Sequence, residues 1–160
     1  MVWGAIRMGK RSPLVIMKRD PEAPKKGFTN WSYIEALHDG LLPIWPHEDG
    51  LFQQDNARIH TANKVKEWQQ ERGIKVLTWP SHSPDLNPIE HVWKAMKDWL
   101  KKQYPELHLL KQNEHNLRLL HGALIEAWNS VPQQKIDLLI TSIERRLLAV
   151  IAAKGWYTHY

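Results

Sequence analysis

The sequence lacks several features that would assign it to a particular class of protein. It contains no cysteine, so it has no disulfide framework, and an intracellular compartment is favoured. Its apolar runs fall far short of the ~20 residues that a membrane helix needs. Charges at Arg7, Lys10 and Arg11 interrupt the apolar start that a signal peptide requires. The sequence also has no internal repeat and no low-complexity segment. From the absence of cysteines, of a membrane helix and of a signal peptide, we expect a soluble intracellular protein.

The length and charge of the chain limit the number of domains and the kinds of partner that it can have. A chain of 160 residues favours one domain, covering residues 1–160. The net charge of +5 arises in residues 1–30, which hold seven Lys/Arg and two Asp/Glu, whereas residues 31–160 hold fifteen of each. This basic segment, which includes Lys10 and Arg11, either contacts nucleic-acid phosphates or forms a solvated loop.

The start of the chain predicts two strands and a helix. Residues 1–6 and 14–17 are apolar and β-forming, and the polar residues 9–13 separate them, which favours a hairpin or two adjacent strands buried on both faces. Residues 20–30 contain prolines, lysines and a glycine and predict an exposed loop. Thr29 or Asn30 then caps a helix that ends at Pro43 and Pro46. Its inward face carries Trp31, Ile34, Leu37, Leu41 and Leu42. A turn follows at residues 47–50.

The middle of the chain predicts a strand, a helix and a second strand. The strands are residues 51–54 and 75–79, both rich in β-forming residues. Thr61 is the expected cap of the helix between them, and Gly73 marks its end. Its inward residues are Val65 and Trp68. This order predicts a βαβ unit with parallel strands.

Helices are expected from there to the end. After a loop at residues 80–86, Asn87 is the expected N-cap and Pro88 the first helical residue. This helix has an apolar stripe at Ile89, Val92, Trp93, Met96, Trp99 and Leu100. Beyond Pro105, one stripe contains Leu117, Leu120, Leu124 and Trp128. A second contains Ile136, Leu139, Ile140, Ile143, Leu147, Val150 and Ile151, and Gly155 ends the last helix.

The predicted topology brings two carboxylates to one edge of the sheet. Asp55 follows the first parallel strand, and Glu90 lies in the first turn of the helix after the second, with 34 residues between them. Open α/β sheets bind ligands outside the carboxyl ends of their strands. Carboxylate oxygens suit Mg²⁺ or Mn²⁺, and two such ions about 3.5–4 Å apart support in-line displacement at a phosphodiester. We therefore predict that Asp55 and Glu90 are catalytic, metal-binding residues.

Structural roles are the alternatives for these acids and for the nearby histidines. Asp55 could be a turn residue paired with Asn56. Glu90 comes three residues after Asn87 and also fits a capping box. His60 and His82 fit hydrogen bonding within loops better than metal coordination, and Asp85 fits bracing of the loop before the helix.

Several polar and basic residues near the acids are candidates for contacts with nucleic acid. Lys94, Lys97 and Lys101 share the helix face of Glu90, and they form either a track for a phosphate backbone or an ordinary solvated face. Beside Asp55, the side chains of Gln53, Gln54, Asn56 and Arg58 are polar enough to contact phosphate or sugar.

Two strings in the chain resemble a known family. They are Phe-Gln-Gln-Asp-Asn-Ala-Arg-Ile-His-Thr-Ala at 52–62 and Trp-Pro-Ser-His-Ser-Pro-Asp-Leu-Asn-Pro-Ile-Glu-His-Val-Trp at 79–93. They resemble the second and third acidic motifs of mariner-type DDE transposases (the Tc/mariner superfamily), and the interval between the acids is similar too. The similarity extends to Val2-Trp3-Gly4 and to residues 142–155 and 158–160, and thus covers nearly the whole chain.

The resemblance implies a fold, an activity and a set of partners. The fold is α/β, with a ribonuclease H-like mixed sheet flanked by helices and followed by C-terminal helices. The activity is cut-and-paste DNA transposition with Mg²⁺ or Mn²⁺, in which Asp55 and Glu90 are the second and third metal-binding acids. The partners are double-stranded DNA, as transposon ends and target, and a second copy of the chain, in the nucleus. Candidate nucleic-acid contacts are Lys10, Arg11, Asn56, Arg58, His60, His82, Lys94, Lys97 and Lys101.

One part of the family pattern has no counterpart. The first catalytic Asp of the family lies on a strand upstream of Trp3-Gly4, and a helix-turn-helix region precedes it. Asp20, Asp39 and Asp49 are the only earlier aspartates, and none has a matching context. We therefore expect an N-terminally truncated catalytic domain that lacks its first strand and cuts DNA little by itself. The alternatives are a non-catalytic nucleic-acid-binding or interaction remnant, and an intact nuclease whose gene begins upstream of Met1.

Overall fold

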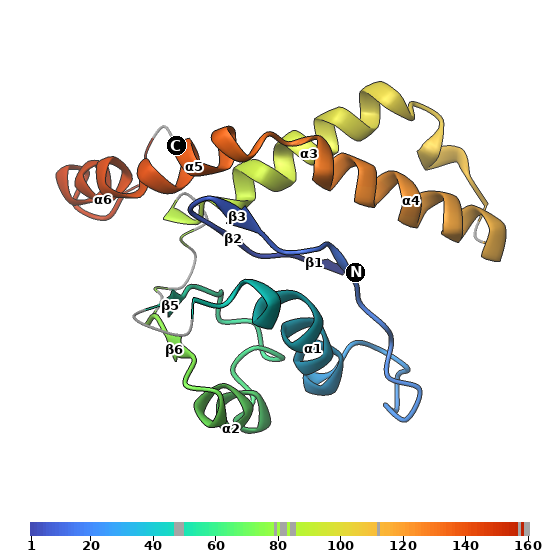
Figure 1. Cartoon of the computed structure of the whole chain (residues 1–160), viewed down its shortest axis with the longest axis horizontal. Helices are drawn as coiled ribbons and strands as arrows, with labels where there is room; N and C mark the ends of the chain where they lie inside the picture. Colours follow the sequence, from blue (N-terminus) through green and yellow to red (C-terminus); the bar gives the residue numbers. More distant parts are fainter. Residues whose placement is uncertain are drawn as a thin grey trace. The chain divides into compact units, whose positions relative to one another are not determined.

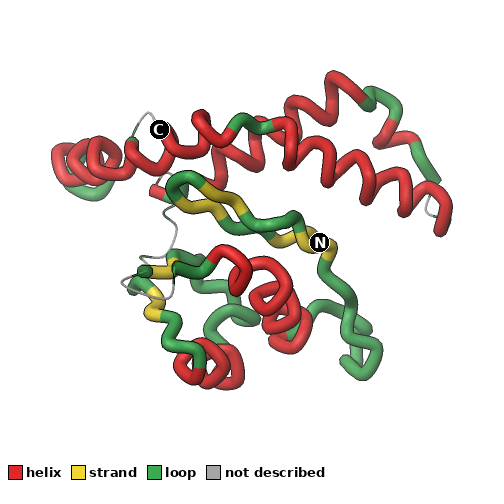
Figure 2. Tube along the Cα trace, in the orientation of Figure 1, coloured by secondary structure: helices red, strands yellow, loops and turns green. Residues whose placement is uncertain are grey.

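The computed structural model describes residues 1–46, 50–78, 80, 83, 86–111, 113–156 and 158. It forms two compact units. The first unit comprises Met1–Ala5 and Arg11–His82, and the second comprises Ile6–Lys10 and Ser83–Tyr160. Figure 2 shows that helices make up most of the regular structure and that the strands are short. The chain thus has the mixed α/β composition that was expected.

The first strands pair as predicted. β1 (Val2–Trp3) runs antiparallel to β4 (Val15–Ile16), with Val2 opposite Ile16 and Trp3 opposite Val15. Trp3 is buried and the other three residues are only half-buried, so the expectation of burial on both faces was wrong for them. The indole of Trp3 lies so close to the backbone of Gly40 that a Cβ there would overlap it. Glycine at position 40 therefore lets β1 pack closely against the helical segment that contains Gly40.

The connection between these strands contains a hairpin of its own. β2 (Ile6–Arg7) and β3 (Lys10–Arg11) form a two-stranded hairpin, with Gly9 at φ +69° in its turn. Just after the hairpin, Ser12 is buried. Its Oγ accepts a hydrogen bond from the backbone N–H of Ala5 at 2.8 Å, and its own N–H donates to the Ala5 carbonyl at 2.8 Å.

The predicted first helix begins as expected. α1 (Asn30–Ala36) has Thr29 as its N-cap in a capping box with Ser32, and it continues through the π-helical η1 (Leu37–Leu41) and the 3-10 helix η2 (Leu42–Ile44). The inward assignment was wrong for Trp31, which is 55% exposed. In the first turn its ring instead lies beneath Lys64, with Nζ 4.7 Å from the ring centroid.

The βαβ unit is present. β5 (Leu51–Phe52) pairs in parallel with β6 (Lys75–Val76), Leu51 opposite Lys75 and Phe52 opposite Val76. α2 (Asn63–Glu71) connects them (Figure 1). Its N-cap is Ala62, so Thr61 was wrongly predicted as the cap, because its hydroxyl donates instead to the Ala57 carbonyl at 3.3 Å. Gly73, at φ +63°, ends this segment as predicted.

The core of the first unit gathers side chains from all these elements. The most deeply buried are aromatic or branched aliphatic, and they include Tyr33, Leu37, Leu41, Ile44, Val65 and Ile74. Trp3 and Phe52 add the buried faces of the two sheets. The unit therefore packs α1 and α2 against short strands, and this packing positions the chain that leaves β5.

Helices build the second unit. They are α3 (Ile89–Gln103), η4 (Leu107–Leu109), α4 (Glu114–Ser130), α5 (Gln133–Thr141) and α6 (Ile143–Ala152). α3 packs on α4 through Trp93 and Trp128, whose ring centroids are 5.1 Å apart. Val92 and Trp128 are completely buried, as their stripes predicted, whereas Leu117 at the start of α4 is exposed.

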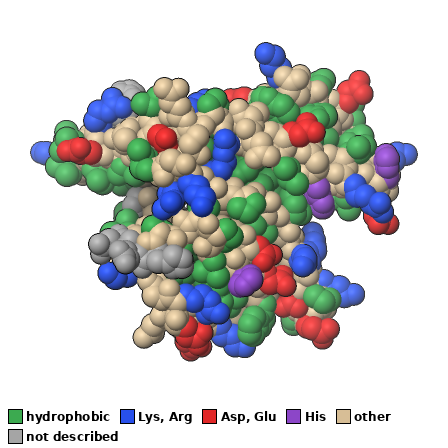
Figure 3. All heavy atoms as spheres, viewed as in Figure 1, with side chains coloured by type: hydrophobic (Ala, Val, Ile, Leu, Met, Phe, Trp, Pro, Cys, Tyr) green, Lys and Arg blue, Asp and Glu red, His purple; other side chains and the backbone are tan. Residues whose placement is uncertain are grey.

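The last predicted stripe is split. It covers two helices, because the chain bends at Ser142, between α5 and α6. Ile136 is fully buried in α5, whereas Leu147 and Ile151 of α6 are exposed, so only part of this stripe is buried. Figure 3 shows hydrophobic side chains at the surface of α6 among charged ones. In the described ranges, no helix is long and apolar enough to cross a bilayer.

α5 also holds the β2–β3 hairpin. The N–H of Gly9 donates to Oδ1 of Asp137 at 2.9 Å, and Nε2 of Gln133 donates to the Arg7 carbonyl at 3.3 Å. Gln133 Nε2 also donates to Oδ1 of Asp137 at 2.9 Å. The hydrogen bonds from Gln133 and from Gly9 hold the pKa of Asp137 below its ordinary value.

Candidate active site

Asp55 lies just downstream of β5, in the first unit. Its Oδ1 accepts a hydrogen bond from the backbone N–H of Ala57 at 3.0 Å and lies 2.6 Å from Nδ1 of His60. The side chain is 65% exposed, and no described residue forms a hydrogen bond with its Oδ2. Asp55 therefore does close a turn, with Ala57 and His60 rather than with Asn56. This role leaves one carboxylate oxygen open for a ligand.

His60 is held by contacts inside the first unit. Its ring stacks on that of Tyr33, with centroids 4.0 Å apart and planes inclined by 28°. Only 19% of its side chain is exposed. The preference for hydrogen bonding within a loop thus agrees with its contact to Asp55, while its expected contact with nucleic acid stays a prediction.

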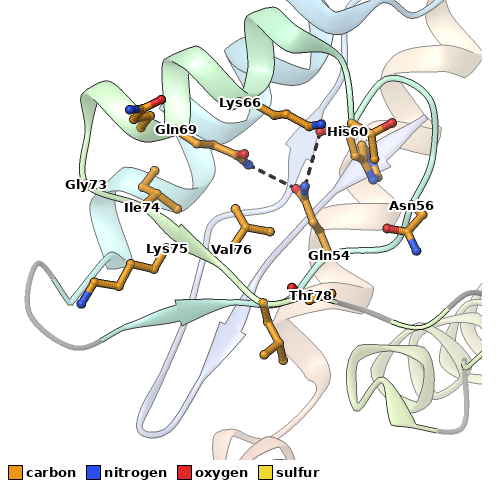
Figure 4. Close-up of a pocket in the computed structure, with 13 residues that line it drawn as sticks. Gln54, Asn56, His60, Lys66, Gln69, Gly73, Ile74, Lys75, Val76 and Thr78 are labelled. Atoms are coloured by element: carbon orange, nitrogen blue, oxygen red, sulfur yellow. Dashed lines mark hydrogen bonds between the residues drawn. The ribbon is translucent and has the colours of Figure 1, made fainter.

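Gln54 joins Tyr33, His60 and α2. Its Oε1 accepts hydrogen bonds from the Tyr33 hydroxyl at 2.7 Å and from Nε2 of Gln69 at 3.3 Å. Its Nε2 donates to the His60 carbonyl at 3.4 Å, and Figure 4 shows both amide contacts. Burial raises the pKa of Tyr33, and the charge of Asp55 raises it further, so Tyr33 stays a neutral donor. The amide expected to reach phosphate is therefore bonded within the protein.

A cavity of about 580 Å³ lies beside this network in the first unit. Its wall includes polar and basic side chains from the end of β5, from α2 and from β6, among them Gln54, Asn56, His60, Lys66 and Lys75 (Figure 4). The sequence did not point to this cavity or to Tyr33 and Gln69, because the packing of the helices on the strands, and not a spacing in the chain, brings these residues together.

Glu90 lies in the first turn of α3, in the second unit. The N-cap of this helix is Pro88, and no side chain caps it. Asn87 was therefore wrongly predicted as the N-cap. Because α3 begins one residue later, the Asn87 carbonyl accepts from the Glu90 N–H, at 3.2 Å. The capping-box alternative for Glu90 is thus not realised. Its exposed carboxylate forms no ion pair with any residue that the structure describes.

α6 braces the same turn. Arg146 is buried, and its Nε donates to the Ser142 hydroxyl at 2.8 Å. Its Nη1 lies 2.8 Å from Nε2 of His91, which must accept because guanidinium has only donors. Burial lowers the pKa of His91, and the charge of Arg146 lowers it further, so the imidazole is neutral. The backbone beside Glu90 is thereby held in place.

The remaining candidates differ in their accessibility. Lys94, Lys97 and Lys101 are all exposed on α3, as both of their alternatives require. Lys10, Asn56 and Arg58 are exposed, and Arg11 is half-buried. His82, Asp85 and most of the predicted turn at 47–50 lie outside the described residues.

The pairing of the two acids stays a prediction. Asp55 belongs to the first unit and Glu90 to the second. Within the described ranges, no three His, Cys, Asp or Glu side chains form a group that could hold a metal ion.

Known structures identify the class of fold. The catalytic domain of the Mos1 mariner transposase matches 99% of this chain and 83% of its own, with a TM-score of 0.65 and 19% identity. A second structure of that domain matches equally well, with a TM-score of 0.65 and 18% identity over 99% of this chain and 82% of its own. At such identities the likeness concerns the fold, which is that of a transposase catalytic domain.

Sequence comparison identifies the family. Residues 5–111 match the DDE superfamily endonuclease family. The transposable element Tcb2 transposase of Caenorhabditis briggsae is 39% identical over 163 residues, covering 100% of this chain and 54% of the relative. This chain therefore belongs to the DDE superfamily endonucleases and is homologous to Tc1/mariner transposases, which confirms the resemblance. It spans about half the length of that relative.

Proposed function

We propose that this chain is the catalytic part of a cut-and-paste DNA transposase. The observation that carries the proposal is the family match over residues 5–111, since that interval contains both Asp55 and Glu90. Asp55 follows the parallel strand β5 and Glu90 lies in the first turn of α3, and both positions support a role in metal-dependent phosphodiester chemistry. In this proposal they are two of the three acids of the family.

For the fold, we propose a larger sheet than the short strand pairs described above. Residues 1–160 form one ribonuclease H-like domain, in which the antiparallel pair β1–β4 and the parallel pair β5–β6 are parts of one mixed sheet. The likeness to the Mos1 catalytic domain over 99% of the chain supports this assignment.

The metal in the proposal is Mg²⁺ or Mn²⁺. The Mos1 catalytic domain has been solved with Mg and with Mn. The donors of this chain fit such an ion, because Oδ2 of Asp55 and the carboxylate of Glu90 are oxygen ligands without described partners. A bound ion would activate the attacking hydroxyl and stabilise the leaving oxygen. Asp55 and Glu90 would hold it.

DNA is the proposed partner. A Mos1 paired end complex has been solved with Mn. In this chain, exposed basic side chains on α3 and on the β2–β3 hairpin supply the charge for phosphate contacts, namely Lys94, Lys97, Lys101 and Lys10. Assembly of two copies on transposon ends, and action in the nucleus, belong to the same proposal.

Direct measurement of Mn²⁺ binding tests the metal site. Titration followed by electron paramagnetic resonance should show weaker binding in Asp55→Ala and in Glu90→Ala than in the unaltered chain. Asp98→Ala is the control. Asp98 is an exposed acid on α3, so its replacement removes the same charge without altering the site. Equal Mn²⁺ affinity in the unaltered chain and Asp55→Ala would contradict the proposal.

A nicking assay tests the chemistry. The 160 residues should nick supercoiled plasmid little or not at all with Mn²⁺, since two carboxylates hold a catalytic ion pair poorly. Robust nicking that disappears in Asp55→Ala would show an intact nuclease. DNA binding without Mn²⁺ binding would favour the non-catalytic remnant.

A further inference from the structure

We propose that His60 is a positioning residue for Asp55. The Nδ1–H of His60 holds Oδ1 of Asp55 and would leave Oδ2 available to bind the metal. This inference rests on the proposed metal-binding role of Asp55. It adds a residue that would act on the metal site through Asp55 without binding the metal itself, and it gives the surrounding network of Tyr33, Gln54 and Gln69 a role.

The contact between the two side chains defines the direction of the hydrogen bond. An ionised carboxylate only accepts hydrogen bonds, so Nδ1 of His60 is the donor across the 2.6 Å separation. Oδ1 also accepts the N–H of Ala57 at 3.0 Å. Two donors on one oxygen fix the rotation of the carboxylate. An exposed Asp without them would sample several rotamers, and a metal would bind at the cost of that freedom.

His60 is itself held on two sides. Its ring stacks on Tyr33, which is 1% exposed and belongs to α1. Its backbone carbonyl accepts from Gln54, and its N–H donates to the Ala57 carbonyl at 2.8 Å. An ordinary surface histidine has no such support.

The network reaches the rigid elements of the first unit. Gln54 receives the hydroxyl of Tyr33 from α1 and the amide of Gln69, which is buried in α2. In Figure 4 the Gln69 side chain points from α2 towards Gln54, between the helix and the strand end. Partners of this kind typically alter metal affinity 10–100-fold when they are removed. Rigid support of Asp55 is therefore the role that we assign to these two amides.

Three substitutions separate hydrogen bonding from packing. His60→Phe keeps an aromatic ring against Tyr33 and removes the donor. His60→Asn places an amide N–H where Nδ1 lies, and His60→Gln places its amide where Nε2 lies. We expect Mn²⁺ affinity about 10-fold lower in the Phe and Gln variants. The Asn variant should bind close to the unaltered chain, and thermal unfolding verifies that each variant is folded.

The outcomes distinguish this inference from the function on which it rests. Unaltered affinity in His60→Phe would overturn the positioning role. An equal loss in the Phe and Asn variants would overturn it too, because an N–H donor at the place of Nδ1 would then not restore the affinity. If Asp55→Ala binds Mn²⁺ as the unaltered chain does, the proposed metal site itself fails.

A measurement on the metal-free, unaltered chain supplies a second readout. The nitrogen-15 shifts of the His60 ring at neutral to basic pH report which nitrogen carries the proton. We expect Nδ1 to be protonated and Nε2 bare, since the bond to Asp55 sets the tautomer. A proton on Nε2 alone would overturn the inference, whatever the affinity of the variants.

Discussion

Asp55 has a turn role that leaves room for the metal binding proposed above. Its Oδ1 closes a turn with Ala57 and His60, and its Oδ2 remains open. A carboxylate can do both because it has two oxygens with separate lone pairs. Glu90 differs, since no cap engages the first turn of its helix and its whole carboxylate is exposed.

Asp137 should make the stability of the chain depend on pH. Its pKa is depressed below the ordinary 3.8 in the folded chain, by Gln133 and by the N–H of Gly9. It therefore stabilises the folded state above that ordinary value, and the contribution disappears as the pH falls through the folded pKa. Asp137→Ala should lower the melting temperature at pH 7. The difference in melting temperature between this variant and the unaltered chain should become smaller in acid. Thermal unfolding from pH 7 downward measures both.

The control for this prediction is Asp98→Ala. Asp98 is exposed on α3 and accepts no side-chain hydrogen bond from the described part of the chain. Its replacement should leave a smaller gap at pH 7. A gap for Asp137→Ala that stays constant into acid would show that the ionised carboxylate is not what holds the hairpin.

Among the elements, the short α2 determines the geometry of the first unit. It spans only Asn63–Glu71, yet it carries the buried Val65 and Gln69 that meet the core and Gln54. A helix this short has little stability of its own, so tertiary packing and its ends decide whether it forms. The reversal after it requires a positive φ at Gly73.

Two glycine-to-alanine changes should have opposite effects. Gly73→Ala forces a Cβ into the left-handed region and should destabilise the chain by about 1–2 kcal/mol. Gly122 lies within α4, with open space where its Cβ would be, so Gly122→Ala should stabilise by about 0.5–1 kcal/mol. Urea unfolding of both variants measures the free energies. The same sign for both would mean that backbone conformation does not decide the effect.

For the molecule as a whole, the main feature is the division of the acids between two units. Asp55 is held by α1 and α2, and Glu90 by α3 and α6. The net charge of +5 suits binding to a polyanion.

The lysine row on α3 gives a prediction about DNA affinity. Lys97→Gln with Lys101→Gln should reduce the slope of log K against log salt by about 2, because each phosphate contact contributes about 0.9. The matched control is Lys102→Gln with Lys111→Gln, which removes the same charge from exposed positions off the face of Glu90. Fluorescence anisotropy with duplex DNA at several salt concentrations measures the slopes. Equal effects of the two pairs would indicate a diffuse charge effect instead of a track.

Much of the local structure could be predicted because it depends on neighbours in sequence. The capping box of Thr29 and the stop at Gly73 follow from local backbone chemistry. Two errors came where a different contact competed with the expected one. Thr61 donates to Ala57 instead of capping α2, and Trp31 pairs with Lys64 at the surface. The long apolar stripe did not reveal the break at Ser142, since helical periodicity continues through it.

The sequence by itself determined the family and the parallel strands near Asp55, because motifs and strand order are local and directional. Only the tertiary structure decided what surrounds Asp55. The stacking of Tyr33 on His60 and the bonds of Gln69 and Gln54 join α1, α2 and the end of β5. No spacing rule connects these residues, since they meet only when the apolar core folds and buries their polar atoms, which must then find one another.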